Sequence, residues 1–233
     1  MNKNSNKAVI LYGPPGSGKG TQAELLSRKF NFIHFDTGRY IEALVHSPEA
    51  NKNRELARER NNFDTGKLCT PSWVLKVVTG MAHNIAGAGF GIVYSGSPRT
   101  IYEVEGDRAH KGLIKTLGDE FGKQNIYVMY LAIKPGTTAK RNGARKVCSV
   151  CGLPVLASSK NAQCALCGGP TKTRTLDNLD VIKVRLKEYE ERTKPVLALL
   201  KKKGFAITTI NGEQAPYLVH RDILRALKLA PKK

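Results

Sequence analysis

The segment GPPGSGKGTQ at residues 13–22 constrains this chain more than any other feature. An apolar stretch at residues 8–12 precedes it, and a helical pattern at residues 23–30 follows it. Glycines between a strand and a helix let backbone N–H groups surround a phosphate, and the helix N-terminus and Lys19 add positive charge. A glycine-rich β-turn is the alternative, but the flanking pattern and the intact lysine favour a phosphate-binding loop. The sequence therefore predicts binding of a nucleoside triphosphate by Gly13, Pro14, Pro15, Gly16, Ser17, Gly18, Lys19, Gly20 and Thr21.

Short apolar runs alternate with longer segments of helical period along the chain. This alternation predicts a three-layer α/β/α fold around a central five-stranded parallel sheet. The predicted strands cover residues 8–12, 32–35, 91–95, 127–132 and 205–210. The predicted helices cover residues 21–30, 39–46, 71–86, 103–117, 178–202 and 215–228. Pro195 predicts a kink or a break in the long helix, because proline has no N–H to donate.

Four of the five cysteines form two pairs, Cys148-x-x-Cys151 and Cys164-x-x-Cys167, each followed by glycine. Two such pairs separated by twelve residues fit a tetrahedral Cys₄ zinc site. Two disulfides are the alternative in an oxidising compartment, and a thioredoxin-type redox pair is another, although it would not be duplicated. We expect structural zinc here and a buried, apolar role for Cys69.

The net charge of +19 is unusual, and residues 121–176 contain nine Lys and Arg but no Asp or Glu. This excess steers anionic substrates, binds nucleic acid or forms a solvated surface, and composition alone does not choose among these. No apolar run approaches the roughly 20 residues needed to cross a membrane, and the polar N-terminus does not look like a signal peptide. We therefore expect a cytoplasmic protein with no membrane partner.

GPPGSGKGTQ, with Gly20 and Thr21 after the lysine, resembles the opening of adenylate kinases and related nucleoside monophosphate kinases. The resemblance extends over nearly the whole chain. Similar segments are Asp36-Thr37-Gly38, Gly66-Lys67-Leu68 and Gly96-Ser97-Pro98-Arg99-Thr100, together with the pairs Arg141/Arg145 and Arg174/Arg185 and the nearby Asp177. It implies a P-loop NTPase core at residues 1–37, 71–138 and 178–233, a monophosphate-binding insertion at 38–70 and a zinc-binding lid at 139–177.

The resemblance also implies a function, namely reversible in-line transfer of the ATP γ-phosphoryl group to AMP or another nucleoside monophosphate, by a monomer that uses Mg²⁺ with ATP. The catalytic residues that it implies are Lys19, Arg99, Arg141, Arg174 and Arg185. Arg141 and Arg145 would join the loop in binding ATP. The monophosphate would be bound by Thr37, Gly38, Arg39, Lys67, Leu68, Gly96, Arg99, Glu103, Arg174 and Arg185.

Four positions depart from the family pattern. Glu42 replaces an arginine that grips the acceptor phosphate, and Ser95 replaces an aspartate that organises the Mg²⁺ hydration shell. Glu103 replaces a glutamine that reads adenine, and Leu176 replaces a lid aspartate. Because three of the four lie at the acceptor or the metal, the sequence supports triphosphate binding more strongly than AMP specificity.

Two other functions remain open from the sequence. The basic zinc module is compatible with a P-loop protein that binds RNA or the ribosome, although the segment has few aromatic side chains for stacking on bases. Glu42 and Ser95 are compatible with a kinase-like protein that binds ATP without turnover. Transfer of a phosphoryl group from ATP to a nucleoside monophosphate would distinguish a kinase from both of these alternatives.

Overall fold

The computed structural model describes residues 7–155, 163–173 and 175–229, so the prediction for Arg174 lies outside the described residues. Its centre is a five-stranded sheet in the order β2-β3-β1-β4-β8, and every neighbouring pair is parallel. The strands are β1 Ala8–Tyr12, β2 Phe32–Phe35, β3 Gly91–Tyr94, β4 Ile126–Ala132 and β8 Ile207–Asn211. The predicted central parallel sheet is thus confirmed, with strand ends displaced by at most two residues.

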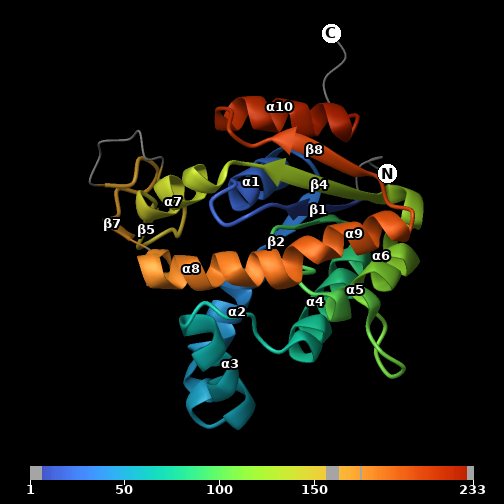
Figure 1. The fold of residues 1–233 in the computed structure, drawn as a ribbon, viewed down its shortest axis with the longest axis horizontal. Coiled ribbons are helices and arrows are strands. Elements are labelled where there is room, and N and C mark those ends of the chain that lie inside the picture. Colours follow the sequence, from blue (N-terminus) through green and yellow to red (C-terminus); the bar gives the residue numbers. More distant parts are fainter. Residues whose placement is uncertain (1–6, 156–162, 174, 230–233) are drawn as a thin grey trace.

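Helices cover both faces of this sheet, as Figure 1 shows. Helices α1 (Lys19–Lys29) and α10 (Pro216–Ala226) lie on one face, and α4 (Pro71–Gly87) lies on the other with α6 (Leu113–Phe121) and α9 (Lys194–Lys202). Strand β1 explains why both layers form, because successive side chains of a strand point to opposite faces. Val9 and Leu11 are buried in the core that holds the α1 and α10 side chains, whereas Ile10 is buried in the core under α4.

The predicted single helix over residues 103–117 is wrong, because the structure has two helices there. Helix α5 covers Ile101–Glu105, and the chain turns at Gly106 before α6 begins. Gly106 has φ +72°, and a Cβ at this position would lie 2.0 Å from the carbonyl oxygen of His110. The helical period on both sides of the turn hides this break in the sequence.

The long helix predicted near the C-terminus continues past Pro195, and its α-helical pattern is interrupted just before the proline. Helix α8 (Leu179–Glu188) passes through a π-helical turn, Tyr189–Thr193, into α9. The N–H of Lys194 donates to the carbonyl of Tyr189, which widens the helix by one residue just before the proline ring. The missing N–H of Pro195 is thereby accommodated without ending the helical run.

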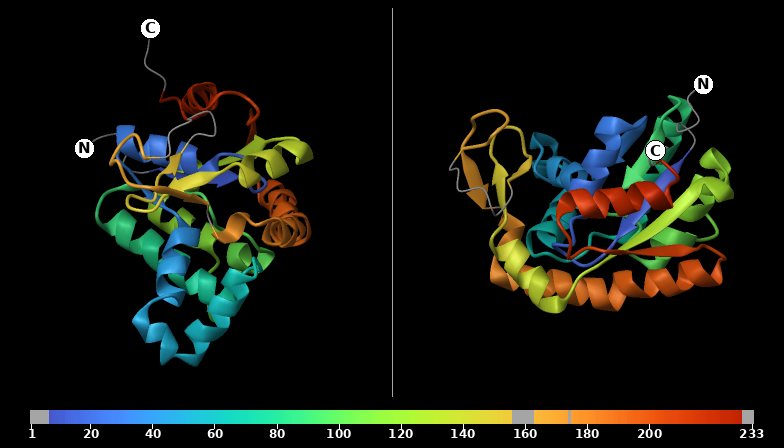
Figure 2. Two further views of the ribbon diagram at one scale, coloured as in Figure 1. Left: turned by 90° about the vertical axis from the view of Figure 1, so that its left-hand side faces the viewer. Right: turned by 90° about the horizontal axis from the view of Figure 1, so that it is seen from above.

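Two segments project from this core. One contains α2 (Thr37–Val45), a 3₁₀ turn at Pro48–Asn51 and α3 (Arg54–Asp64), a helix that the polar sequence did not predict. The other begins with α7 (Pro135–Gly143) and forms an antiparallel sheet in the order β6-β5-β7, with strands Pro154–Val155, Lys146–Cys148 and Thr171–Thr173. Two short 3₁₀ turns lie at Lys123–Asn125 and Thr175–Asp177. In Figure 2 the small sheet lies at one end of the molecule, beside the start of α8.

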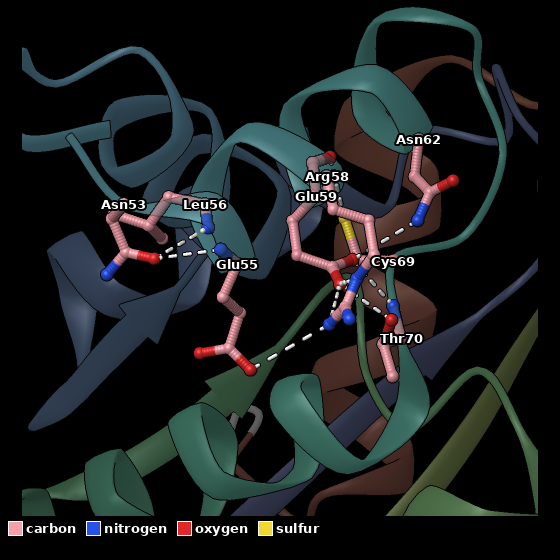
Figure 3. Close-up of polar contacts among 8 residues, drawn as sticks. All are labelled: Asn53, Glu55, Leu56, Arg58, Glu59, Asn62, Cys69 and Thr70. Atoms are coloured by element: carbon pink, nitrogen blue, oxygen red, sulfur yellow. Dashed lines mark hydrogen bonds and ion pairs between the residues drawn. The ribbon is translucent and has the colours of Figure 1, made fainter. Parts of the chain in front are cut away.

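A buried carboxylate fixes α3 to the beginning of α4 (Figure 3). Glu59 has no exposed side-chain surface and accepts hydrogen bonds from the Thr70 N–H at 2.8 Å and the Thr70 hydroxyl at 2.6 Å. Arg58 and Asn62 also donate to this carboxylate. The Sγ of the buried Cys69 lies 3.6 Å from the Glu59 carbonyl, so the expectation that Cys69 is buried is confirmed.

None of the described helices is long and apolar enough to serve as a membrane span.

Candidate functional site

A cavity of about 850 Å³ lies beyond the carboxyl ends of the strands, between the core and the two projecting segments. The predicted residues that line it are Gly13, Pro15, Gly16, Ser17, Gly18, Lys19, Gly20, Thr21, Gly38, Arg39, Lys67, Leu68, Gly96, Arg99, Arg141, Arg145 and Arg185. The carboxyl edge of a parallel sheet is where such folds bind ligands. Segments that lie far apart in the sequence thus meet at one hollow.

The loop after β1 has the geometry of a phosphate cradle. Gly13, Gly16 and Gly18 all have positive φ angles, and a Cβ on Gly13 would lie 2.5 Å from the Ser17 Oγ. Helix α1 begins at Lys19 directly after Gly18, which has no side chain to cap the first N–H groups. The Lys19 Nζ donates to the carbonyls of Gly13 at 2.7 Å and Pro14 at 3.0 Å. The N-terminus of α1 and this lysine therefore face the space that the loop encloses.

The electrostatics of the site favour an anion. Burial holds the pKa of Lys19 well below its ordinary value, and the nearby positive charges of Arg99, Arg185 and Arg145 lower it further. These arginines come from a loop after β3, from α8 and from the segment after α7. Lys19 and these arginines place four basic side chains around one cavity, and a bound polyphosphate would neutralise their charge.

The arginines beside the lid are held in defined positions. Arg145 forms a two-pronged ion pair with Asp177, whose side chain is wholly buried, and its Nε lies 2.7 Å from Asp177 Oδ2. Arg185 Nη1 donates to the carbonyl of Leu176 at 3.2 Å and lies 3.6 Å from Asp177 Oδ1. Arg141 reaches the opposite wall, where its Nη1 donates to the Gly212 carbonyl at 2.9 Å.

Of the described residues that were predicted to bind nucleotide, three do not line the cavity. Pro14 contributes its carbonyl to Lys19, and the buried Thr37 packs against Gly96. Glu103 is buried at the start of α5 and accepts hydrogen bonds from the Arg99 N–H and the Thr100 hydroxyl.

Thr100 is the N-cap of α5, and its hydroxyl oxygen accepts from the Glu103 N–H while the same hydroxyl donates to the Glu103 carboxylate. Burial raises the pKa of Glu103, although the hydrogen bonds from Arg99 and Thr100 favour its charged form. Its predicted contact with the acceptor base stays a prediction. The structure gives this side chain a second role, which is to fix the backbone at Arg99.

The sequence analysis missed a chain of three polar side chains beside the phosphate loop. His34 Nε2 lies 2.9 Å from the Ser95 Oγ, and His34 Nδ1 lies 3.4 Å from Glu24 Oε2. All three line the cavity. Because His34 lies on β2, Ser95 follows β3 and Glu24 lies on α1, only the folded topology brings them together.

Asn142 is a second cavity-lining residue that the sequence analysis missed. It is fully buried between Arg141 and the phosphate loop, and neither amide atom has a hydrogen-bond partner among the described residues. A Cβ on Gly16 would lie 3.0 Å from its Nδ2, so α7 packs directly on the loop. In the sequence, only its position between Arg141 and Arg145 could have indicated that Asn142 belongs to the site.

The four paired cysteines meet in the small sheet. Their sulfurs lie within 4.8 Å of one another, with Cys148 and Cys167 at 3.4 Å and Cys151 and Cys164 at 3.7 Å. A tetrahedral site with Zn–S bonds of about 2.3 Å needs sulfurs about 3.8 Å apart, so this group fits zinc. Backbone N–H groups of Cys151 and Val150 point at the Cys148 sulfur and lower the pKa of its thiol. Such a turn favours the thiolate form that binds metal.

Comparisons with known proteins agree with this geometry. The profile of a family described as "Adenylate kinase" matches residues 11–205. The adenylate kinase of Caldicellulosiruptor saccharolyticus is 30% identical in an alignment of 226 residues that covers 94% of this chain and 98% of that protein. The adenylate kinase of Chlamydia pneumoniae is 30% identical and covers 94% of this chain and 96% of its own length. That of Bacillus thuringiensis, also 30% identical, covers 92% and 95%. The chain belongs to the adenylate kinase family.

Proposed function

We propose that this protein transfers the γ-phosphoryl group of ATP to AMP, with other nucleoside monophosphates as weaker acceptors. Membership of the family makes the chain a nucleoside monophosphate kinase, and AMP is the acceptor named by its curated relatives. The observation that carries the proposal is that Lys19, Arg99, Arg145 and Arg185 line one cavity. Burial, and then the charges of the three arginines, lower the pKa of Lys19 there.

The donor would lie along the phosphate loop. Backbone N–H groups at the start of α1 and Lys19 would bind its β- and γ-phosphates, and Arg141 would hold the donor from the lid side. Mg²⁺ bound with ATP would neutralise charge on the phosphate oxygens. Thr21, Asp36 and Ser95 line the cavity with oxygen atoms, the donor type that suits this ion.

The acceptor would occupy the side of the cavity formed by the first projecting segment. We assign its phosphate to Arg99, whose Nη2 approaches Gly96 so closely that a Cβ there would lie 3.3 Å away. Gly38, Lys67 and Leu68 line the same cavity and would flank the nucleoside. A monophosphate is already anionic, so transfer needs no general base and depends on alignment and charge neutralisation.

Transfer instead of hydrolysis requires that water be excluded. We propose that residues 139–177 act as a lid and residues 38–70 as the monophosphate-binding insertion, closing over the reactants from two sides. The lid residues Cys148 to Val155 line the cavity in this structure. Arg145 and Arg185 would then contact the transferring group, with Arg174 assigned to the same role by sequence.

The test is ATP-dependent phosphorylation of AMP, GMP, CMP and UMP in parallel, with Arg99→Ala as the matched variant. We expect the highest kcat/KM with AMP and a loss of roughly 100-fold in Arg99→Ala, the size typical of one lost transition-state donor. Tight ATP binding without transfer to any acceptor would contradict the proposal. RNA binding that weakens steeply with salt would then become the leading function.

A further inference from the structure

Arg39 extends from α2 in the first projecting segment to the cysteine turn of the second. A Cβ built on Gly152 would lie 2.7 Å from Arg39 Nη2 and 3.3 Å from Arg39 Cζ. Both residues line the cavity. The guanidinium therefore lies directly on the backbone that follows Cys151, with no side chain between them.

The backbone conformation at Gly152 explains why no side chain blocks the approach of Arg39. Gly152 has φ +69°, a conformation that residues with a side chain rarely adopt, and its N–H donates to the Cys148 carbonyl at 3.1 Å. The turn that closes the cysteine pair thus presents bare backbone toward Arg39. A glycine required by the turn also permits the close approach of the arginine.

The charge distribution gives the contact an electrostatic basis. Four thiolates around one divalent cation carry a net double negative charge. Residues 121–176 contain no Asp or Glu, so this centre is the negative group that the segment itself can offer to an arginine. Arg39 lies beside Gly152, the residue next to the ligand Cys151.

We propose that Arg39 is a positioning residue that holds the lid closed over the cavity by binding to the zinc-loaded cysteine turn at Gly152. This inference deepens the proposed function and rests on it, because closure matters to a transferase that must exclude water. Arg39 would act on the closing motion and not on the acceptor phosphate, the partner that the sequence analysis assigned to it. The zinc centre thereby shapes the lid and also supplies the charge that draws it toward the insertion.

The experiment measures lid closure in the zinc-loaded protein without nucleotide, so that it does not depend on turnover. Two dyes are attached through azidophenylalanine at the exposed positions Lys52 in the insertion and Leu166 in the lid, which leaves the cysteines untouched. Energy transfer between the dyes then reports the ratio of open to closed molecules. The compared variants are Arg39→Gln, Arg39→Lys and Arg54→Gln, the last removing an exposed arginine from the same insertion.

We expect Arg39→Gln to raise the open-to-closed ratio by about fivefold, the upper range for a partly solvated charge interaction. Arg39→Lys should keep the ratio near that of the wild type, because the positive charge remains, and Arg54→Gln should leave it unchanged. The inference is overturned if Arg39→Gln matches the wild type, or if Arg54→Gln opens the lid equally. An Arg39→Gln variant that raises only the KM of the monophosphate would likewise overturn it, in favour of phosphate binding.

Failure of the proposed function would appear separately. A wild-type protein that closes its lid through Arg39 but transfers no phosphoryl group would contradict the kinase assignment and leave the contact intact.

Discussion

Arg145 and Asp177 lie 32 positions apart in the chain and yet form a two-pronged ion pair near the two ends of the segment that we propose as a lid. Arg145 follows α7, where the lid segment begins, and Asp177 lies just before α8, where it ends. The Asp177 side chain is wholly buried, and Arg185 Nη1 lies 3.6 Å from the same carboxylate. One carboxylate therefore fixes both ends of the lid and two of the arginines that we assign to phosphoryl transfer.

We expect Asp177→Asn to impair both stability and catalysis. The neutral amide keeps the shape but leaves Arg145 without its charged partner, which should lower the free energy of unfolding by about 1–3 kcal/mol. Displaced arginines should lower kcat by roughly 10- to 100-fold. Thermal unfolding and steady-state kinetics measure the two effects. Asp180→Asn is the control, because its side chain is 88% exposed, and an equal effect there would contradict the assignment.

ATP binding should be accompanied by proton uptake at Lys19. Burial and then Arg99, Arg185 and Arg145 lower the pKa of Lys19 in the free protein, and a bound triphosphate would raise it again. The complex therefore binds more protons than its components, and ATP affinity should fall as the pH rises through the pKa of the free lysine. Calorimetry in buffers of different ionisation enthalpy, over the pH range in which the folded protein is stable, counts these protons. Lys19→Met should abolish the uptake, and a wild-type protein without uptake across this range would refute the prediction.

Much of the fold could be predicted from the sequence because its signals are local. The buried strands are short apolar runs such as Ala8–Tyr12, and the phosphate loop is defined by consecutive residues. The break between α5 and α6 could not be predicted in this way. It depends on Gly106 approaching the carbonyl of His110, a contact that the helical pattern on either side conceals.

The candidate site was predictable where motifs mark it and not where the topology alone assembles it. Arg99, Arg141 and Arg185 were found through the resemblance of their segments to a known family, and all three line the cavity. The hydrogen bond between His34 and Ser95 joins residues 61 positions apart, one on β2 and the other directly after the neighbouring strand β3. No local pattern connects such residues, so only the sheet order brings them together.

Glu59 should make stability depend on pH. Burial alone would raise the pKa of Glu59, but hydrogen bonds from Thr70, and then from Arg58 and Asn62, hold it below its ordinary value. A lowered pKa in the folded state means that the stabilisation is present above the pKa of the unfolded chain and is lost as the pH falls through the folded value. Glu59→Gln should therefore lower the free energy of unfolding by about 1–3 kcal/mol at pH 7. The difference should shrink in acid, whereas a constant difference in urea titrations across pH would argue against a charged Glu59.

Removal of zinc should affect stability more than the chemistry of the molecules that remain folded. The small sheet is built from three short strands around the cysteines, so metal binding contributes directly to its folding. We expect Cys164→Ala to lose the metal and to unfold at a lower temperature, with a smaller change in kcat. Elemental analysis and scanning calorimetry measure this. Cys69→Ala is the matched control for metal content, and a Cys164→Ala variant as thermostable as the wild type would contradict a structural zinc site.

Glu103→Gln tests whether this carboxylate reads the acceptor base. Both of its oxygens accept hydrogen bonds from its own helix start, at the Arg99 N–H and the Thr100 hydroxyl. We therefore expect the ratio of kcat/KM for AMP and GMP to change by less than about threefold, because one hydrogen bond to a base is worth considerably more in discrimination. The KM for AMP and the KM for GMP should both rise, since Gln has one oxygen where Glu103 uses two to accept from the Arg99 N–H and the Thr100 hydroxyl. Glu105→Gln, an exposed position on the same helix, should change neither quantity. A reversal of the AMP to GMP preference in Glu103→Gln would show that the carboxylate leaves its capping position and contacts the base.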